Sequence, residues 1–362
     1  MHVSRNYTLP WINFFFVCIW LFTATNSYAA GPEADTADIP AVSNSKGPLL
    51  GKNLFIPFLL HYNFPSLPAS SGERYDLQYH LSLYYTNDVD YADNDGSWHK
   101  VKRDYIRGNI ARDYESLAVE LGLAYNFLKQ LQVGIDMRMY SYYGGFLDII
   151  IETFHGIFGF PNAGREFFLQ NKLYINIPND NGITMFLDQP AVSFGDIDLW
   201  GKWTFFENGR VSLGILGAFK LPTGRLAALS GSDYPDAAIG LLLDFRALQY
   251  ITLFAQAGAV FPFNKSYTMF NGMAGLEFHP WKLWSIIAQM NFKTSPISNS
   301  EWNSAHGAYF RDYSLMQGNF LLGAVYRNRN FRLQFYLEED AINHQGTDIT
   351  FNITFSRTIN LK

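Results

Sequence analysis

The chain has 362 residues, of which 48% are hydrophobic, 17% aromatic and only 16% charged, against roughly 25% charged in an ordinary soluble domain. Its 22 Tyr and 32 Phe are typical of the aromatic girdles of transmembrane barrels, although a soluble β-sandwich could share this composition. The net charge of −5 forms no basic stripe, which argues against nucleic acid as a partner.

Residues 1–29 have the pattern of a secretory signal peptide. Arg5 is followed by an apolar run at residues 11–22 and then by small residues ending at Ala29, where we expect cleavage. The run is too short for a transmembrane helix, so we expect export through the inner membrane. Cys18, the single cysteine, lies in this run, and the mature chain would therefore contain no disulfide.

Residues 30–46 combine proline with acidic and small polar residues, a composition that predicts a flexible leader. Residues 47–73 are largely apolar but do not alternate cleanly, and Pro57 interrupts their most hydrophobic stretch. A central strand would not tolerate that proline. We therefore predict that residues 47–73 form a segment in the periplasm or inside the lumen of a barrel.

From residue 75 onward, apolar residues recur at every second position, the period of a strand with one apolar face. The longest hairpin sets Leu117, Val119 and Leu121 against Ala118 and Glu120, and its two arms are each about ten residues long, enough for a tilted strand to cross a bilayer. Strands are predicted at residues 75–85, 116–126, 131–141, 193–206, 210–221, 236–245, 250–261, 267–278, 283–293, 314–326, 331–338 and 349–355.

The connections between these strands alternate between short turns and longer loops, as in outer-membrane barrels. The pattern predicts an all-β fold, a closed antiparallel transmembrane β-barrel of about 12 strands over residues 74–362, located in the outer membrane. The count would rise to 14 if residues 54–62 and part of 166–177 joined the sheet. A soluble sandwich is the alternative, but its strands would be shorter and would hide their apolar faces in a core.

Residues opposite the apolar faces should point into the lumen. Their charges have both signs, which predicts cross-strand ion pairs in a narrow, largely filled lumen. They either keep the interior hydrated or line a selective path, and the candidates for such a path are Asp136, Arg138, Asp196, Asp198 and Lys202.

The loop after the third strand changes its period near residues 146–158, where the apolar residues Leu147, Ile150, Ile151, Phe154 and Phe158 predict an amphipathic helix. Asp148, Glu152 and His155 would share its other face, and we expect contacts with Arg165 or with lumen residues. Glu152 and His155 have the spacing of half a di-metal site, but the sequence offers no second copy. We predict neither metal ligands nor a cofactor.

Several motifs resemble an uncharacterised bacterial family, domain of unknown function 3187. They are Gly47–Leu49, Gly144–Asp148, the run from Phe154 to Arg165, and Gly195–Asp196. The resemblance implies an outer-membrane β-barrel and no established activity. The Lys220–Gly224 corner also looks like corners in barrels that move hydrophobic compounds.

The leading hypothesis is a narrow channel or transporter for small or hydrophobic solutes, gated by a loop helix that folds over or into the lumen. One alternative is a non-transporting surface barrel with partner-binding loops at residues 87–113 and 294–312. Another is a lipid-modifying enzyme that uses His80 or His155, although we expect no catalytic residues. The expected partners are the lipid bilayer, the barrel-assembly machinery and a small solute or lipid.

Overall fold

The computed structural model describes residues 45–92, 110–159, 170–177, 185–296, 316–328, 331–342 and 346–362. The predicted signal peptide, Arg165 and most of the two predicted partner-binding loops lie outside these ranges. The elements are η1 (Phe58–Leu60), β1 (Asp76–Ala92), β2 (Ile110–Asn126), β3 (Leu131–Tyr143), α2 (Leu147–Phe158), β4 (Tyr174–Ile177), β5 (Met185–Leu187), β6 (Ala191–Glu207), β7 (Val211–Leu221), η3 (Leu226–Ala228), β8 (Asp236–Leu248), β9 (Ile251–Pro262), β10 (Met269–Phe278), β11 (Trp284–Lys293), β12 (Gln317–Arg327), β13 (Phe331–Ile342) and β14 (Ile349–Asn360).

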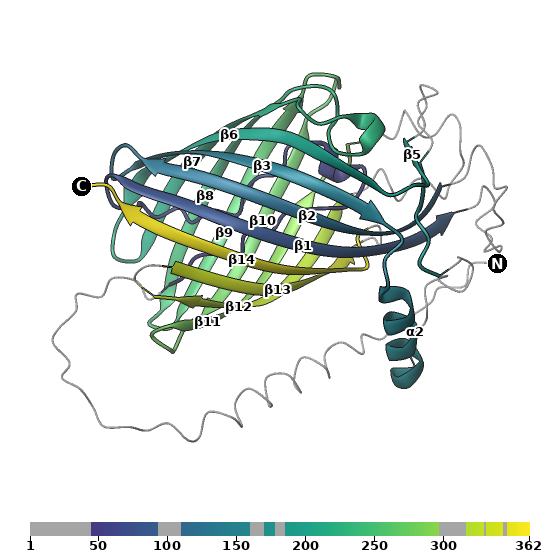
Figure 1. Cartoon of the computed structure of the whole chain (residues 1–362). Helices are drawn as coiled ribbons and strands as arrows, with labels where there is room; N and C mark the ends of the chain where they lie inside the picture. Colours follow the sequence, from purple (N-terminus) through teal and green to yellow (C-terminus); the bar gives the residue numbers. More distant parts are fainter. Residues whose placement is uncertain are drawn as a thin grey trace, which may run out of the picture. The chain divides into compact units, whose positions relative to one another are not determined.

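Twelve of these strands form a closed antiparallel ring (Figure 1). Starting at β1, the next strands around the ring are β14, β13, β12, β11, β10, β9, β8, β7, β6, β3 and β2. β2 then pairs with β1 and closes the ring. β4 pairs with residues 111–113 of β2, and β5 pairs with β4, so that both extend the rim without entering the ring. The predicted all-β, twelve-stranded barrel is therefore confirmed. Of the two segments that would have raised the count to 14, residues 174–177 join the sheet at its rim as β4, whereas residues 54–62 form no strand.

The two ends of the ring differ in their connections. Short turns join β2 to β3, β6 to β7, β8 to β9, β10 to β11 and β12 to β13, and we call this the turn end. Longer segments join the strands at the opposite, loop end. β1 and β2 continue as far as Ala92 and Ile110 at the loop end, further than the predicted strands, because residues there pair without an apolar face that alternation could reveal.

The strand alternation sorts side chains between the two faces of the wall. On β2, Leu121 and Leu123 are 50% and 46% exposed, whereas Glu120, which directly precedes them, is 2% exposed. The same inversion recurs around the ring, with apolar side chains exposed outside and polar ones buried inside. A membrane barrel needs this distribution because lipid solvates its outer face.

Residues 45–73 lie inside the ring, and we call them the plug. Lys46 bonds to groups of β10 and its following turn at the turn end. The apex, around η1, contacts residues at the loop end of β7, β8 and β11. The chain then returns, and Tyr75 bonds to Asn126 at the turn end just before β1 begins. The plug is thus a hairpin that traverses the lumen twice.

Candidate functional site

Most of the plug has no regular secondary structure, so its backbone groups need partners from the wall. On the ascending arm, the Gln289 side chain accepts a hydrogen bond from Leu49 N at 3.0 Å and donates one to Leu49 O at 3.2 Å. The Arg332 guanidinium on β13 donates to the carbonyls of Lys46 and Pro48 at 3.1 and 2.6 Å. The wall therefore supplies the hydrogen bonds that a neighbouring strand would otherwise make.

The descending arm is held by β6 and β8. The Lys202 ammonium donates to the carbonyls of Pro68 and Ser70 at 2.9 and 2.8 Å. The Asp244 carboxylate accepts from the backbone N–H groups of Ala69 and Ser70 at 2.9 and 3.0 Å. One cation and one anion thus grip the same three residues of the plug, which fixes its register against the wall.

The apex is held in the same way. Lys293 donates to the carbonyl of Phe58 at 2.6 Å, and Lys220 donates to that of Leu60 at 3.1 Å. Asp236 accepts from Tyr62 N at 2.7 Å and lies 3.4 Å from His61 Nδ1. Burial lowers the pKa of His61 below its ordinary value, outweighing the neighbouring Asp236 carboxylate.

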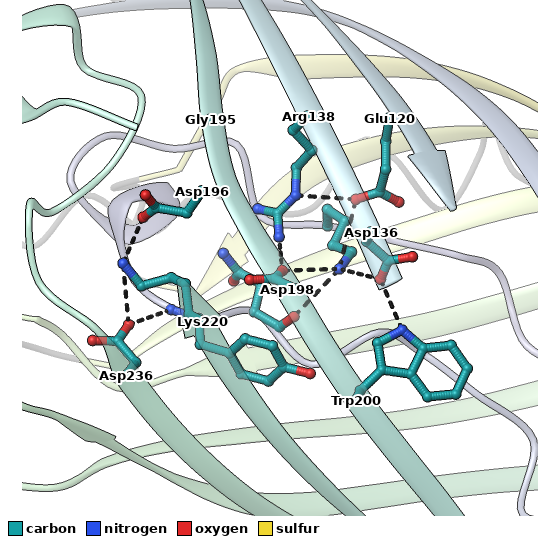
Figure 2. A network of polar contacts seen from close by, with 12 residues as sticks. Glu120, Asp136, Arg138, Gly195, Asp196, Asp198, Trp200, Lys220 and Asp236 are labelled. Carbon is teal, nitrogen blue, oxygen red and sulfur yellow. Dashed lines mark hydrogen bonds and ion pairs between the residues drawn. The ribbon is translucent and has the colours of Figure 1, made fainter. Parts of the chain in front are cut away.

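Halfway along the lumen, the plug contributes a charge of its own. Lys52 Nζ lies 3.6, 3.7 and 3.9 Å from carboxylate oxygens of Glu120, Asp136 and Asp198, respectively. Arg138 pairs with Glu120 at 3.2 Å and also with Asp198. Figure 2 shows the four wall residues pointing toward one another from neighbouring strands. We call these five residues the central cluster.

The central cluster is buried, and each of its side chains is at most 6% exposed. Taking these charges out of water is costly unless they are paired, so removal of one partner would leave an uncompensated charge. His80, Glu120 and Asp136 have potential metal-ligand atoms within 4.8 Å of one another. The two carboxylates already face the Lys52 ammonium, and the arrangement therefore fits ion pairing of the plug better than a metal centre.

The five wall residues predicted from the sequence lie at three levels of the lumen. Asp136, Arg138 and Asp198 belong to the central cluster. Asp196 accepts a hydrogen bond from Lys220 at 2.5 Å nearer the loop end (Figure 2), and Lys202 binds the plug nearer the turn end. They do not line one open path, because the plug lies between them.

The predicted helix forms as α2, but it projects from the loop end outside the ring of strands (Figure 1), whereas the sequence predicted a helix over or within the lumen. Asp148 accepts from Asn171 N at 2.9 Å, and Glu152 accepts from Gln170 at 2.8 Å. The His155 ring lies 6.2 Å from the Phe154 ring. The structure thus places these three residues away from the lumen residues that they were expected to contact.

His80, one of the two histidines considered for a lipid-modifying enzyme, lies inside the barrel, as does Ser82 two residues further along β1, and the two side chains contact different partners. His80 Nε2 is 3.2 Å from Glu120, and the Ser82 hydroxyl accepts from Thr354 at 2.8 Å.

Lys52 was not among the residues predicted from the sequence, although the sequence contains a signal for it. Between Gly47 and Gly72, Lys52 is the only Lys, Arg, Asp or Glu, and a lone charge in an apolar segment needs a buried counter-charge.

The gap between the plug and the wall is small. The cavity bounded by the plug and by β9, β10 and β11 has a volume of about 40 Å³ and is lined by residues such as Gly51, Asn63 and Asn291. This is room for a water molecule or two, and not for a solute of several heavy atoms. A larger hollow of about 660 Å³ opens on the outer face of β2, β3, β6 and β7.

A closed ring with an apolar outside and a polar, filled lumen has the fold of outer-membrane β-barrels. The chain belongs to the family described as protein of unknown function (DUF3187), whose model matches residues 105–358. The match confirms the resemblance stated from the sequence motifs.

A solved structure supports this fold. An outer membrane channel from Pseudomonas putida F1 is 11% identical with a TM-score of 0.51, and the alignment covers 80% of this chain and 98% of that one. The toluene transporter TodX of P. putida is 10% identical with a TM-score of 0.38, covering 79% and 90%, respectively. None of the curated proteins compared with the chain matches it.

Proposed function

We propose that this protein is an outer-membrane channel that is closed at rest by its own plug and that admits small hydrophilic solutes when the plug moves. The turn end and the start of the plug would face the periplasm, and the loop end would face outward. The observation that carries the proposal is the set of wall lysines, Lys202, Lys220 and Lys293, whose ammonium groups donate to backbone carbonyls of the plug.

These bonds hold a segment that is not itself part of the sheet. The pairing of β1 with β2 closes the ring without any contribution from the plug. Displacement of the plug would therefore leave the backbone hydrogen bonds of the ring intact. Water could replace the hydrogen bonds between the wall and the plug, so the polar side chains of the wall would remain hydrated after the plug has moved. A wall of this kind supports passage of hydrophilic solutes more readily than of hydrophobic ones.

The charge of the wall indicates the selectivity of the open lumen. Among the described wall residues that are buried inside the ring, acidic side chains outnumber basic ones. The acidic residues are Asp88, Glu120, Asp136, Asp196, Asp198, Asp236, Glu277 and Glu338, and the basic residues are Arg112, Arg138, Lys202, Lys220 and Lys293. Because pore-lining acidic groups favour cations, the channel without its plug should prefer cations.

Planar-bilayer recording tests the proposal. The full mature chain should open rarely, and a variant lacking residues 45–72 should conduct steadily with a cation preference. A second variant, Lys202→Met with Lys293→Met, keeps the plug but weakens its attachment and should open more often than the unaltered chain. If the folded deletion variant and the double variant both fail to conduct, the channel proposal is wrong.

A further inference from the structure

The amino end of α2 is attached to the outer face of the barrel. Glu115 has the same parity on β2 as the exposed Leu121 and Leu123, so its side chain leaves the wall on the outside. Its carboxylate accepts hydrogen bonds from Phe146 N at 2.8 Å and Leu147 N at 2.5 Å. A carboxylate at this position stabilises a helix by satisfying its first N–H groups and by opposing its dipole.

Aromatic side chains continue from the wall onto the helix. The Tyr85 ring lies 6.2 Å from the Tyr143 ring and 5.9 Å from the Phe146 ring, measured between ring centroids. The Tyr85 hydroxyl also donates to Glu115. Tyrosines on the outer face near the end of the apolar band are typical of the girdle at a membrane interface. The lipid-facing surface of the barrel therefore runs without interruption onto α2.

In α2 the apolar side chains are exposed and a charged side chain is buried, which is the reverse of a helix surrounded by water. Phe146, Ile149, Ile150 and Ile157 are 52–71% exposed and recur at the spacing of one helical face. Asp148 on the covered face is 5% exposed and bonded to Asn171. In a water-exposed helix the charged face would be outermost. The exposed apolar face of α2 thus requires an apolar partner.

α2 is too short to cross a membrane. It extends from Leu147 to Phe158 and ends at Gly159, which adopts a left-handed conformation. Twelve residues give a helix about 18 Å long, against the ~20 residues that a membrane crossing needs. No helix in the described part of the chain is long and apolar enough to cross a membrane. In Figure 1, α2 points away from the wall, across the direction of the barrel axis.

We propose that α2 is an interfacial helix that lies in the membrane plane at the loop end, with Phe146, Ile149, Ile150 and Ile157 inserted among the acyl chains of that leaflet. Glu115 fixes its amino end to the wall, and the segment that contains Gln170 and Asn171 covers its polar face. The partner is the lipid itself, which solvates the apolar face as it does the adjoining outer surface of the barrel.

Spin labelling in lipid vesicles tests this placement. Single cysteines replace Ile150 or Ile157 in a Cys18→Ser background, and each carries a nitroxide. Leu241→Cys on the exposed outer face of β8 provides the lipid reference, and Lys282→Cys in an exposed turn provides the aqueous one. The ratio of oxygen accessibility to nickel-chelate accessibility is measured at each position.

We expect the ratio at residues 150 and 157 to lie close to that at residue 241 and several-fold above that at residue 282. A ratio equal to the aqueous reference would overturn the proposal. So would an immobilised label inaccessible to both reagents, because the face would then be covered by protein. Each labelled barrel is first shown to be folded by circular dichroism, and Ile149→Cys replaces any variant that fails. The readout does not depend on conductance, so it is separate from the channel proposal.

Discussion

Replacement of Lys52 by methionine tests the role of the central cluster in holding the plug. Methionine retains most of the volume of the side chain but removes the ammonium that faces Glu120, Asp136 and Asp198 at 3.6–3.9 Å. Arg138 then remains to compensate the three carboxylates, with His80 beside them. Truncation of one partner of a buried ion pair typically costs about 3–5 kcal/mol.

The cost applies chiefly to the state in which the plug is seated, because release of the plug hydrates the carboxylates. A loss of about 3 kcal/mol would shift the equilibrium between seated and released plug on the order of 100-fold toward release. Single-channel recording measures this shift as an increase in open probability. Lys52→Arg keeps the charge and should stay nearer the unaltered protein, and Lys282→Met removes an exposed lysine from a turn as a control.

An unchanged open probability in Lys52→Met would refute the reasoning, provided that circular dichroism shows a folded barrel. It would mean that the three carboxylates are compensated without Lys52, or that plug position does not govern conductance. An equal rise in the Lys282→Met control would instead indicate a general effect of lost positive charge. The comparison of the two variants therefore separates the buried contact from net charge.

Three further predictions concern pH and packing. The pKa of buried His61 lies below its ordinary value of 6.5, so the seated plug binds fewer protons than the released one. The seated state therefore has its full stability above pH 6.5 and loses stability as the pH falls below that value. Open probability should rise at acidic pH, and less so in His61→Gln. Gly217→Ala should stabilise the barrel by about 0.5–1 kcal/mol in urea unfolding, because nothing lies within 4 Å of the new methyl group. Gly134→Ala should destabilise it by about 1–3 kcal/mol, because its methyl would approach the Trp200 ring to 2.2 Å.

The face of the wall to which an added Cβ would point explains why these two glycines differ. Gly217 is paired with Gly201 across β6 and β7, and both belong to the cavity of about 660 Å³ that opens outward. Gly134 also lines this cavity, but it belongs to the inward-facing residues of β3, so its Cβ would point at the Trp200 indole, which donates to Asp136 at 3.1 Å. The sequence contains the three glycines, but only the cross-strand register shows which of them has space around it.

The strands could be predicted because their signal is local. Alternation over about ten residues is sufficient to assign a face to each side chain, and short turns fix the order of neighbours. The register then follows, and Asp136 does lie opposite Asp198 as two inward residues of adjacent strands. Exposure of Leu121 beside burial of Glu120 is the same alternation seen in three dimensions.

The plug and α2 could not be placed in this way, because their positions depend on contacts between residues far apart in the chain. Lys52 and Asp198 are brought together only when the ring has closed around residues 45–73. The periodicity of α2 predicted a helix but not its side of the wall, which Glu115 determines from another strand.

The sequence by itself therefore determined the barrel, its strand number and the sorting of side chains between lipid and lumen, since all three follow from a two-residue period. Only the tertiary structure decided which residues fill the lumen and how the wall holds them, and that α2 lies outside the ring. Those outcomes depend on where buried charges and unpaired backbone groups find partners, and such partners are separated by up to more than two hundred residues.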